Sequence, residues 1–474
     1  MATSDNQALV SKQGLHQILD TQRKAYYTHG IPTLKQRIES LDKLLSILKT
    51  NQHTIAEAIS NDFGHRAHQE TRLIELFLCM DGIKHTRRRL KKWMQPQNRS
   101  ISMWFIGASN RVMPQPLGVV GIIVPWNYPL FLCISPLIGA LASGNRCMIK
   151  MAANSGHLSQ LLQDLFAEHF AQDQLAIVPD AKGSDFSALA FDHLVFTGST
   201  TTGRQVMRAA ADNLTPVTLE LGGKSPTIIA PDYSIAKAAE RILFSKCLNA
   251  GQTCVAPDYL FVPESKAEEF VAVAKTIVSG RYPDIDSDDY TSIINDSAYM
   301  RLKSTLADAI HLGAISITLA PNSVTNDTTR KFPPTLLTGV TSNMRVMQEE
   351  IFGPILPIIT YQHIDEVLHY INSQDRPLGL YLFSNDKAMQ EKVINKTRSG
   401  GVCINDTALH VGQHDMPFGG VGESGMGQYH GVEGFMAMSK LRPIFKQARY
   451  STLALLYPPY GKRFDAIIRL MLRL

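Results

Sequence analysis

Cys254 is the residue of this chain whose surroundings best suit covalent chemistry. It lies in the short polar stretch 249–259, after residues 235–247, which have the apolar spacing of a helix, and before residues 259–262, which have the composition of a strand. A thiol in such a turn can reach a cleft and act as a nucleophile. Cys133, inside an apolar run, represents the alternative, because a cysteine among apolar side chains usually serves packing. The turn alone leaves both interpretations of Cys254 open.

Residues 196–204 form a turn that could bind a phosphate group. Gly198, Ser199 and Gly203 lie in this stretch, which follows an apolar strand pattern and opens a predicted helix. The free N–H groups and the positive dipole end at the start of a helix attract anions. A cofactor phosphate and a plain capped helix start are both compatible with this pattern.

Two other glycine patterns do not meet the conditions of the motifs that they resemble. Residues 420–425 match G-x-G-x-x-G, but no predicted strand precedes them. Residues 223–225 resemble the end of a P-loop, but Thr218 occupies the position that needs glycine. We therefore give neither of them a nucleotide-binding role.

Alternating strands and helices must position these residues. Residues 118–124 are a continuous apolar run typical of a buried strand, and strand and helix patterns then alternate for about a hundred residues. A second alternating region begins near residue 225. The chain is therefore predicted to contain two doubly wound α/β units in series.

Length and composition indicate an ordinary globular protein. At about 150 residues per domain, the 474 residues predict two to four domains. A net charge of +5 is small for this length and argues against general nucleic-acid binding. The basic cluster at residues 84–92 continues a predicted helix, so we interpret it as a solvated helix end, with an anionic-surface patch as the alternative.

No segment has the pattern of a transmembrane helix. Residues 112–145 carry no charge and are long enough to span a bilayer, but five prolines interrupt them. Residues 464–474 form a short basic amphipathic helix, which we expect to dock on its own protein or on a partner subunit. The six cysteines include no C-x-x-C pair and no secretory signal precedes them, so we expect free thiols, a cytoplasmic location and no metal site.

Five separated stretches together resemble the aldehyde dehydrogenase superfamily. They are residues 125–127 (PWN), 196–204, 219–226 (LELGGKSP), 251–254 (GQTC) and 349–354 (EEIFGP). The resemblance covers residues 34–443. Residues 254–259, 376–384 and 425–431 further resemble the class 3-like branch, and residues 457–463 are similar to the end of bacterial coniferyl aldehyde dehydrogenases.

The resemblance implies a fold with two doubly wound α/β domains and a β oligomerisation arm. A nicotinamide-cofactor-binding domain is expected at residues 1–97 and 117–222, and a catalytic domain at 223–405. The oligomerisation arm is expected at residues 98–116 and 406–440, followed by a tail at 441–474. Members of this branch are usually homodimers, so a homodimer is the implied assembly.

The resemblance also implies a mechanism. Cys254 would be the nucleophile that attacks an aldehyde carbon to give a thiohemiacetal, with the Asn127 side chain and the Cys254 backbone N–H stabilising the oxygen. Hydride transfer to the cofactor would leave a thioester. Glu220, at the end of a predicted strand, would activate the water that releases the acid. A loop-capping role for Asn127 and a surface carboxylate for Glu220 are the alternatives without the resemblance.

The remaining motif positions would bind NAD or NADP. Glu350 and Phe352 match the residues that hold the nicotinamide ribose and ring in the family. Gly198 and Ser199, in the glycine turn with Gly203, match the pyrophosphate site. Trp126 and Lys150 match the adenosine side.

The adenosine side departs from the family pattern. The family usually has Lys-Pro-Ser-Glu, whereas residues 150–153 of this chain read Lys-Met-Ala-Ala. Ala153 therefore lacks the carboxylate that would bind the adenosine ribose and repel a 2′-phosphate, and the loop 178–183 lacks the usual glycines. We expect weak discrimination against NADP, with Lys150 available to a 2′-phosphate.

The sequence supports three kinds of function. The first is NAD(P)-dependent oxidation of an aldehyde to a carboxylic acid, with a coniferyl-type aromatic aldehyde or a medium- or long-chain aliphatic aldehyde as the small-molecule substrate. The second is cysteine-dependent ester hydrolysis or acyl transfer without redox chemistry. The third is a non-catalytic member, which the altered adenosine side keeps open. Glu350, Phe352 and the glycine turn favour the first, because neither alternative needs a nicotinamide site.

Overall fold

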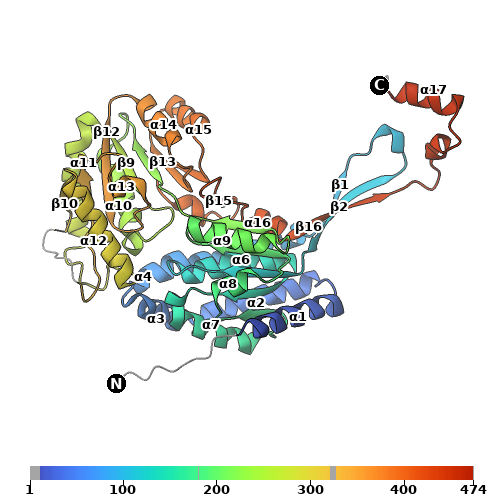
Figure 1. The fold of residues 1–474 in the computed structure, drawn as a ribbon, viewed down its shortest axis with the longest axis horizontal. Coiled ribbons are helices and arrows are strands. Elements are labelled where there is room, and N and C mark those ends of the chain that lie inside the picture. Colours follow the sequence, from blue (N-terminus) through green and yellow to red (C-terminus); the bar gives the residue numbers. More distant parts are fainter. Residues whose placement is uncertain (1–10, 180, 321–326, 473–474) are drawn as a thin grey trace.

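Two α/β bodies and a projecting arm make up the molecule. A computed structural model describes residues 11–179, 181–320 and 327–472 of the chain. The first body lies below the second in Figure 1, and the arm extends away from the first body. The predicted fold class is therefore confirmed, while the functional roles of the domains remain a prediction.

The first body is built on a six-stranded sheet with the order β15-β7-β6-β3-β4-β5. All neighbours are parallel except β15, which runs antiparallel to β7. The strands are β3 (Val119–Ile123), β4 (Arg146–Lys150), β5 (Leu175–Ile177), β6 (His193–Thr197), β7 (Val217–Glu220) and β15 (Gly425–Met426).

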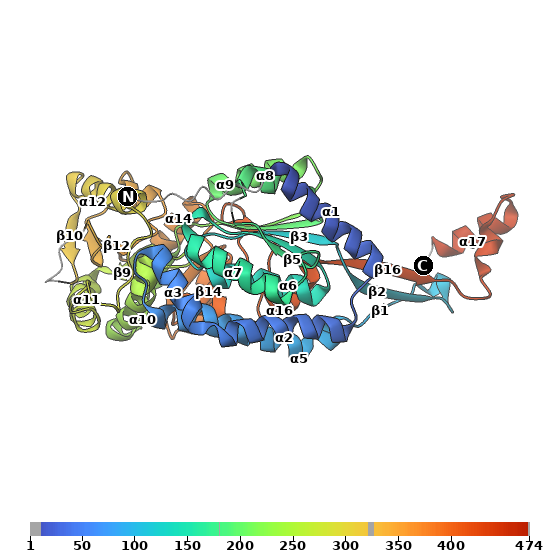
Figure 2. The ribbon, with the colours of Figure 1, turned by 90° about the horizontal axis from the view of Figure 1, so that it is seen from below.

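Helices cover both faces of this sheet (Figure 2). One face carries α1 (Lys12–His29), α8 (Gly183–Ser187) and α9 (Thr200–Ala211), and the other carries α2 (Leu34–Thr50), α3 (Gln52–Phe63), α5 (Leu78–Trp93), α6 (Pro129–Ser143) and α7 (Gly156–His169). Val119 packs with the first group and Val120 with the second. Burial on both faces explains why the sequence of β3 is a continuous apolar run.

The second body is built on a seven-stranded sheet with the order β10-β11-β12-β9-β8-β13-β14. Only β10 is antiparallel to its neighbour. The strands are β8 (Pro226–Ile229), β9 (Tyr259–Pro263), β10 (Ile315–Thr318), β11 (Thr335–Thr338), β12 (Ile355–Tyr361), β13 (Gly379–Phe383) and β14 (Gly401–Ile404). The helices are α10 (Ile235–Cys247), α11 (Ala267–Arg281), α12 (Asp296–His311), α13 (Arg345–Gln348), α14 (Ile364–Ser373) and α15 (Lys387–Lys396).

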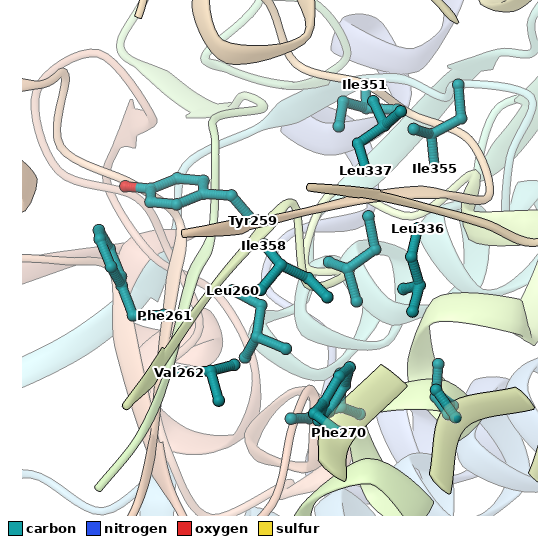
Figure 3. Close-up of a cluster of buried hydrophobic side chains, with 14 of the residues drawn as sticks. Tyr259, Leu260, Phe261, Val262, Phe270, Leu336, Leu337, Ile351, Ile355 and Ile358 are labelled. Carbon is teal, nitrogen blue, oxygen red and sulfur yellow. The ribbon is translucent and has the colours of Figure 1, made fainter. Parts of the chain in front are cut away.

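The core of the second body lies between these strands and helices. Figure 3 shows Leu260 and Val262 of β9 beside Ile358 of β12 and Phe270 of α11. All of these side chains are almost completely buried. This core fixes the position of β9 and therefore of the turn that precedes it, which contains Cys254.

The arm is a three-stranded antiparallel sheet with the order β1-β2-β16. Its strands are β1 (Gln97–Arg99), β2 (Ser109–Pro116) and β16 (Ser439–Lys446). The first predicted arm segment, 98–116, contains β2, but only the last two residues of the second segment, 406–440, pair with it. Residues before β16 instead supply β15 and α16 (Gly431–Ala437), which pack on the first body. The domain boundaries implied by the resemblance stay a prediction, and most of β16 lies in the predicted tail rather than in the second predicted arm segment.

The tail after the arm ends in α17 (Lys462–Met471), as its amphipathic pattern predicts. The main contact of α17 is with the short 3₁₀ helix Thr452–Leu456, and both project beyond the arm (Figure 1). Docking of this helix on either body is therefore not seen among the described residues, whereas docking on a partner subunit stays a prediction. Residues 473–474 lie outside the described part. Among the described residues, no helix has the length and apolarity needed to cross a membrane.

Candidate active site

A cavity of about 640 Å³ lies where the two bodies meet. The first body contributes residues after β3, β6 and β7, and the second contributes the Cys254 turn and the loop before β12. The lining includes eight predicted site residues, namely Trp126, Asn127, Gly198, Ser199, Glu220, Cys254, Glu350 and Phe352. The carboxyl ends of parallel strands meet at one edge of a sheet, which explains how stretches so distant in sequence come together.

Cys254 follows a backbone turn of unusual geometry. Asn249 and Ala250 both adopt left-handed conformations, with φ of 52° and 49°. Gly251, with φ of 72°, passes so close to the carbonyl of Gly353 that a Cβ would overlap it. Such strained backbone persists only where the surroundings enforce it, and it is frequent at functional sites. The turn thus holds the thiol at the cavity wall rather than in the core.

The surroundings of the Cys254 thiol disfavour its ionisation. Although the residue is half-buried, burial at the cavity wall raises its pKa to about 12, and Glu350 and Glu220 add to the rise. The backbone N–H groups of Cys254 and Val255 oppose it. A positive charge beside the sulfur would favour the thiolate, which is the reactive form.

Asn127 lies beside the nucleophile turn. Its side-chain Nδ2 donates to the backbone carbonyl oxygen of Gln252 at 3.2 Å. The backbone carbonyl oxygen of Asn127 accepts from Nδ2 of Asn249 at 3.1 Å. Both partners belong to the stretch that ends at Cys254. The amide is therefore held at the cavity with one N–H engaged and the other able to face a substrate oxygen.

Glu220 ends β7 and is only 2% exposed. Neither of its carboxylate oxygens has a hydrogen-bond partner among the described residues. Burial therefore raises its pKa well above the usual range. A buried carboxyl without a partner is costly, and a raised pKa suits proton transfer near neutral pH.

Glu350 and Phe352 lie on the loop before β12. Glu350 approaches Gly222 so closely that a Cβ there would overlap the carboxylate, and burial, followed by Asp258, raises the pKa of Glu350 to about 8. Phe352 has a left-handed φ of 47°, and its ring meets Trp126 edge to face at 5.4 Å. Lys224, in the loop after β7, donates to the carbonyl oxygens of Val346 and Glu349 at 2.8 and 2.9 Å and so ties its loop to this one.

Ser199 caps the N-terminus of α9 at the end of β6. Its Oγ accepts the N–H of Thr202 at 3.3 Å, as the capped-helix interpretation requires. Gly198 lines the cavity, whereas Gly203 does not, and its missing side chain instead admits Leu221 of the neighbouring strand end. The turn thus provides an anion-binding geometry at the cavity.

Lys150 ends β4, beside β3, and does not line the cavity. Its Nζ donates to the carbonyl of Met151 at 2.7 Å, and its Cε lies near Gly183 of the loop after β5. Ala153 begins an exposed 3₁₀ turn and offers no polar side chain. Asp180, in the predicted loop 178–183, lies outside the described residues.

Sequence reasoning missed several residues that shape the site. Arg301 on α12 lines the cavity and donates to the carbonyls of Glu350 and Ile351 at 3.4 and 2.8 Å. Phe418 also lines the cavity, although it precedes the rejected glycine pattern. Arg66 was in no motif, yet it is fully buried and donates to the carbonyl of Asn127 at 3.2 Å. No local sequence signal marks these residues as part of the site, because their roles depend on contacts with residues distant in the sequence.

The residues present fit a nicotinamide dinucleotide. The glycine turn and the start of α9 suit a pyrophosphate, and Gly198 and Gly222 line the cavity without side chains of their own. Glu350 offers a carboxylate for a ribose hydroxyl, and Phe352 offers a ring edge for a planar heterocycle.

Comparisons with known proteins agree with this arrangement. The model of the aldehyde dehydrogenase family matches residues 6–444. A probable coniferyl aldehyde dehydrogenase from Pseudomonas aeruginosa is 50% identical over 457 residues, which are 96% of this chain and 95% of that protein. The substrate-bound state of AldH from Staphylococcus aureus has a TM-score of 0.90 and 36% identity over 96% of this chain and 99% of its own. An aldehyde dehydrogenase from Mycobacterium tuberculosis complexed with NAD+ has a TM-score of 0.83 and 27% identity over 93% and 92%.

Proposed function

This chain belongs to the aldehyde dehydrogenase family, and from that premise we propose that it oxidises coniferyl-type aromatic aldehydes to carboxylic acids with NAD or NADP. The observation that carries the chemistry is that Cys254, Asn127 and Glu220 line one cavity, and that the Glu220 carboxyl has no hydrogen-bond partner in the described part of the chain. These groups are the nucleophile, the oxyanion donor and the base that such an oxidation needs.

The first step uses Cys254 and Asn127. The Cys254 thiol first loses its proton to solvent, and the thiolate then forms a bond to the aldehyde carbon. The carbonyl electrons move onto the oxygen and give a thiohemiacetal anion. The Asn127 amide and the Cys254 backbone N–H donate to that oxygen. Each such donor lowers the barrier by about 3 kcal/mol. The engagement of Asn127 with Gln252 keeps the amide in place before substrate arrives.

The second step needs the cofactor and then Glu220. Glu350, Phe352, Gly198 and Ser199 would hold the dinucleotide, which when bound would supply the hydride acceptor. The oxidised carbon is then a thioester of Cys254. Glu220 removes a proton from a water molecule that attacks this thioester, the carbon–sulfur bond breaks, and the acid leaves. The raised pKa of Glu220 suits it to this transfer.

The aromatic substrate class is supported by the relative at 50% identity. The mainly apolar character of the residues around Cys254, including Leu132, Leu378 and Phe418, suits a planar hydrophobic substrate. Medium- and long-chain aliphatic aldehydes are the competing class. An assay of cofactor reduction at 340 nm with cinnamyl-type and aliphatic aldehydes tests the assignment. A higher kcat/KM for aliphatic aldehydes would overturn it, and hydrolysis of an aromatic ester without any aldehyde oxidation would indicate an esterase.

Cofactor choice is a separate prediction. Ala153 supplies no carboxylate to bind the adenosine ribose or to repel a 2′-phosphate. Lys150, three residues earlier, places a cationic side chain at the end of β4. We therefore expect kcat/KM values for NAD and NADP that differ by less than about a hundredfold, or ~2.7 kcal/mol. The substitution Ala153→Glu should shift the ratio toward NAD. A wild-type preference for NAD above that limit would contradict the prediction.

We further propose that the chain forms a homodimer through its arm and works in the cytoplasm. Ile106, Leu441 and Phe445 of the arm are exposed apolar side chains, and isolated projecting strands need a partner for such surfaces. Light scattering should give twice the mass of one chain. A double variant, Ile106→Glu with Phe445→Glu, should give the mass of one chain, and an unchanged mass would contradict the proposal. All six cysteines are free, as a reducing compartment requires.

A further inference from the structure

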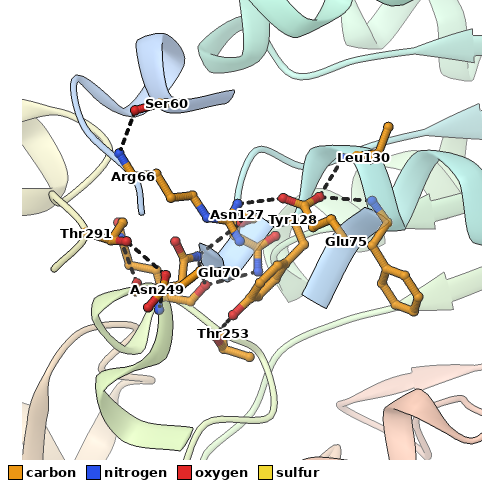
Figure 4. A network of polar contacts seen from close by, with 12 residues as sticks. Ser60, Arg66, Glu70, Glu75, Asn127, Tyr128, Leu130, Asn249, Thr253 and Thr291 are labelled. Atoms are coloured by element: carbon orange, nitrogen blue, oxygen red, sulfur yellow. Dashed lines mark hydrogen bonds and ion pairs between the residues drawn. The ribbon is translucent and has the colours of Figure 1, made fainter. Parts of the chain in front are cut away.

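A buried ionic cluster lies directly behind the Asn127 turn (Figure 4). We call Arg66, Glu70 and Glu75 the Arg66 cluster. The Arg66 side chain is 0% exposed, and its Nη1 lies 2.6 Å from Oε1 of Glu75 and 3.2 Å from the carbonyl oxygen of Asn127. Its guanidinium carbon lies 4.8 Å from the centroid of the Tyr128 ring. One guanidinium therefore holds the backbone and the ring that flank the predicted oxyanion donor.

Glu75 fixes the helix that follows this turn. Its Oε2 accepts the N–H groups of Leu130 and Phe131 at 2.7 and 3.0 Å. These N–H groups belong to the first turn of α6, where a carboxylate also interacts favourably with the helix dipole. The same carboxylate thus links Arg66 to the start of α6, one residue beyond Tyr128.

Glu70 fixes the turn that carries the nucleophile. Its Oε2 accepts the backbone N–H of Asn249 at 3.0 Å and the hydroxyl of Thr291 at 2.9 Å. Asn249 is one of the two left-handed residues before Cys254, and its side chain donates to the Asn127 carbonyl. The cluster therefore touches the nucleophile turn of one body and the oxyanion turn of the other.

The cluster is a costly way to stabilise a fold. Nε and Nη2 of Arg66 have no hydrogen-bond partner among the described residues. Burial raises the pKa of Glu70 and of Glu75, and Arg66 is the largest opposing influence on each. A buried ion pair often contributes less to stability than apolar residues of similar volume. Something other than stability therefore favours this arrangement.

The backbone conformation around Glu75 also indicates a functional role for the cluster. Glu75 lies in a π-helical segment, Thr71–Phe77, between the single turn His68–Glu70 and α5. π-helical turns are rare and occur frequently at functional sites, because they redirect side chains that a regular helix would place elsewhere. Here the segment directs Glu75 toward Arg66 and the start of α6.

We propose that the Arg66 cluster is the positioning unit that fixes the Asn127 amide and the Cys254 turn relative to each other. Arg66 does not line the cavity, so it acts through Asn127 rather than on the substrate. The inference rests on the proposed roles of Cys254 and Asn127. A displacement of about 1 Å between reacting groups can cost about a hundredfold in rate.

The first test is the substitution Arg66→Met, which keeps an unbranched apolar stem and removes the charge and the donors. We expect kcat to fall tenfold to hundredfold, by about the cost of displacing a reacting group. The KM for cofactor should change by less than about twofold, because the hydrogen bonds and ring contacts of the Arg66 side chain with described residues are to Phe63, Glu75, Asn127 and Tyr128, none of them a predicted cofactor-binding residue. Arg66→Lys should restore part of the loss. A folded Arg66→Met enzyme with wild-type kcat would overturn the inference.

Arg37→Met is the matched control. Arg37 is also a buried arginine, 4% exposed. It donates to the carbonyl of Pro32, before α2, and to that of Ala142, near the C-terminal end of α6. Its loss should lower the melting temperature and leave kcat unchanged. An equal fall of kcat in both variants would mean that Arg66 is only structural.

A double-mutant comparison with Asn127 distinguishes a positioning role of Arg66 from a general loss of structure. In an Asn127→Ala background, Arg66→Met should lower kcat by less than about threefold, because the group that Arg66 positions is gone. If Arg66→Met does not fold, Arg66→Lys carries the same comparison in both backgrounds. Full additivity in either series would overturn the inference. Activity that survives Cys254→Ala would instead overturn the proposed function, whatever the Arg66 variants show.

Discussion

Replacement of Cys254 by alanine should abolish aldehyde oxidation. Removal of the nucleophile from a covalent enzyme lowers kcat by about 10⁵-fold or more, because no other group can hold the acyl intermediate. Among the described residues, Cys254 is the only cysteine that lines the cavity. Cofactor reduction at 340 nm with a cinnamyl-type aldehyde should therefore fall to the background rate.

Two control measurements distinguish loss of the nucleophile from loss of folding or of cofactor binding. Cys133→Ala removes a completely buried thiol from the core of the first body and should leave kcat unchanged. Binding of NAD to the Cys254→Ala enzyme, followed by tryptophan fluorescence, should keep its affinity within about threefold, since the sulfur is not expected to hold the cofactor. A Cys254→Ala enzyme that keeps more than about 1% of wild-type turnover would exclude Cys254 as the nucleophile.

Local pattern was enough to predict the elements around Cys254. The predicted helix 235–247 and the strand from residue 259 appear as α10 and β9, because each has a continuous apolar face and a polar turn between them. The same reasoning predicted β3 and the start of α9 after the glycine turn. These elements depend on their own residues and on simple burial.

Pairing across the chain was not predictable in this way. In the arm and in the first body, β16 pairs with β2, and β15 with β7, over hundreds of residues, and no local pattern specifies these pairings. A strand pattern states that a face is buried but not which strand lies beside it. The resemblance to a family supplied the candidate site residues, yet it gave no role to Arg301 or Arg66, whose contacts depend on where distant loops meet.

The cavity also explains why two carboxyl groups near Cys254 do not need the same role. Glu350 lies against Gly222 and receives a backbone hydrogen bond from Gly223, so it is held in place. Glu220 has no partner among the described residues and can take up a proton without breaking a bond. Environments that differ in this way separate a binding carboxylate from a catalytic base.

Replacement of Glu220 by glutamine should therefore stop turnover after the first oxidation. The amide keeps the shape of the side chain but cannot accept a proton from water, so steady-state kcat should fall about 10²- to 10⁴-fold. Thioester formation does not need this base. Rapid mixing should therefore still show a burst of about one reduced cofactor per active site. Glu264→Gln, on the surface of the second body, should change neither phase.

The pH dependence provides an independent check on Glu220. Burial raises its pKa, so the carboxyl is protonated and inactive at low pH and becomes a base as pH rises through that raised value. Wild-type kcat should therefore increase with pH along a limb displaced well to the alkaline side of an ordinary glutamate. Glu220→Gln should remove this limb, because nothing at that position then titrates. A Glu220→Gln enzyme that loses the burst as well, or keeps the limb, would assign the base to another group, and Glu350, whose pKa is raised to about 8, is the next candidate in the same cavity.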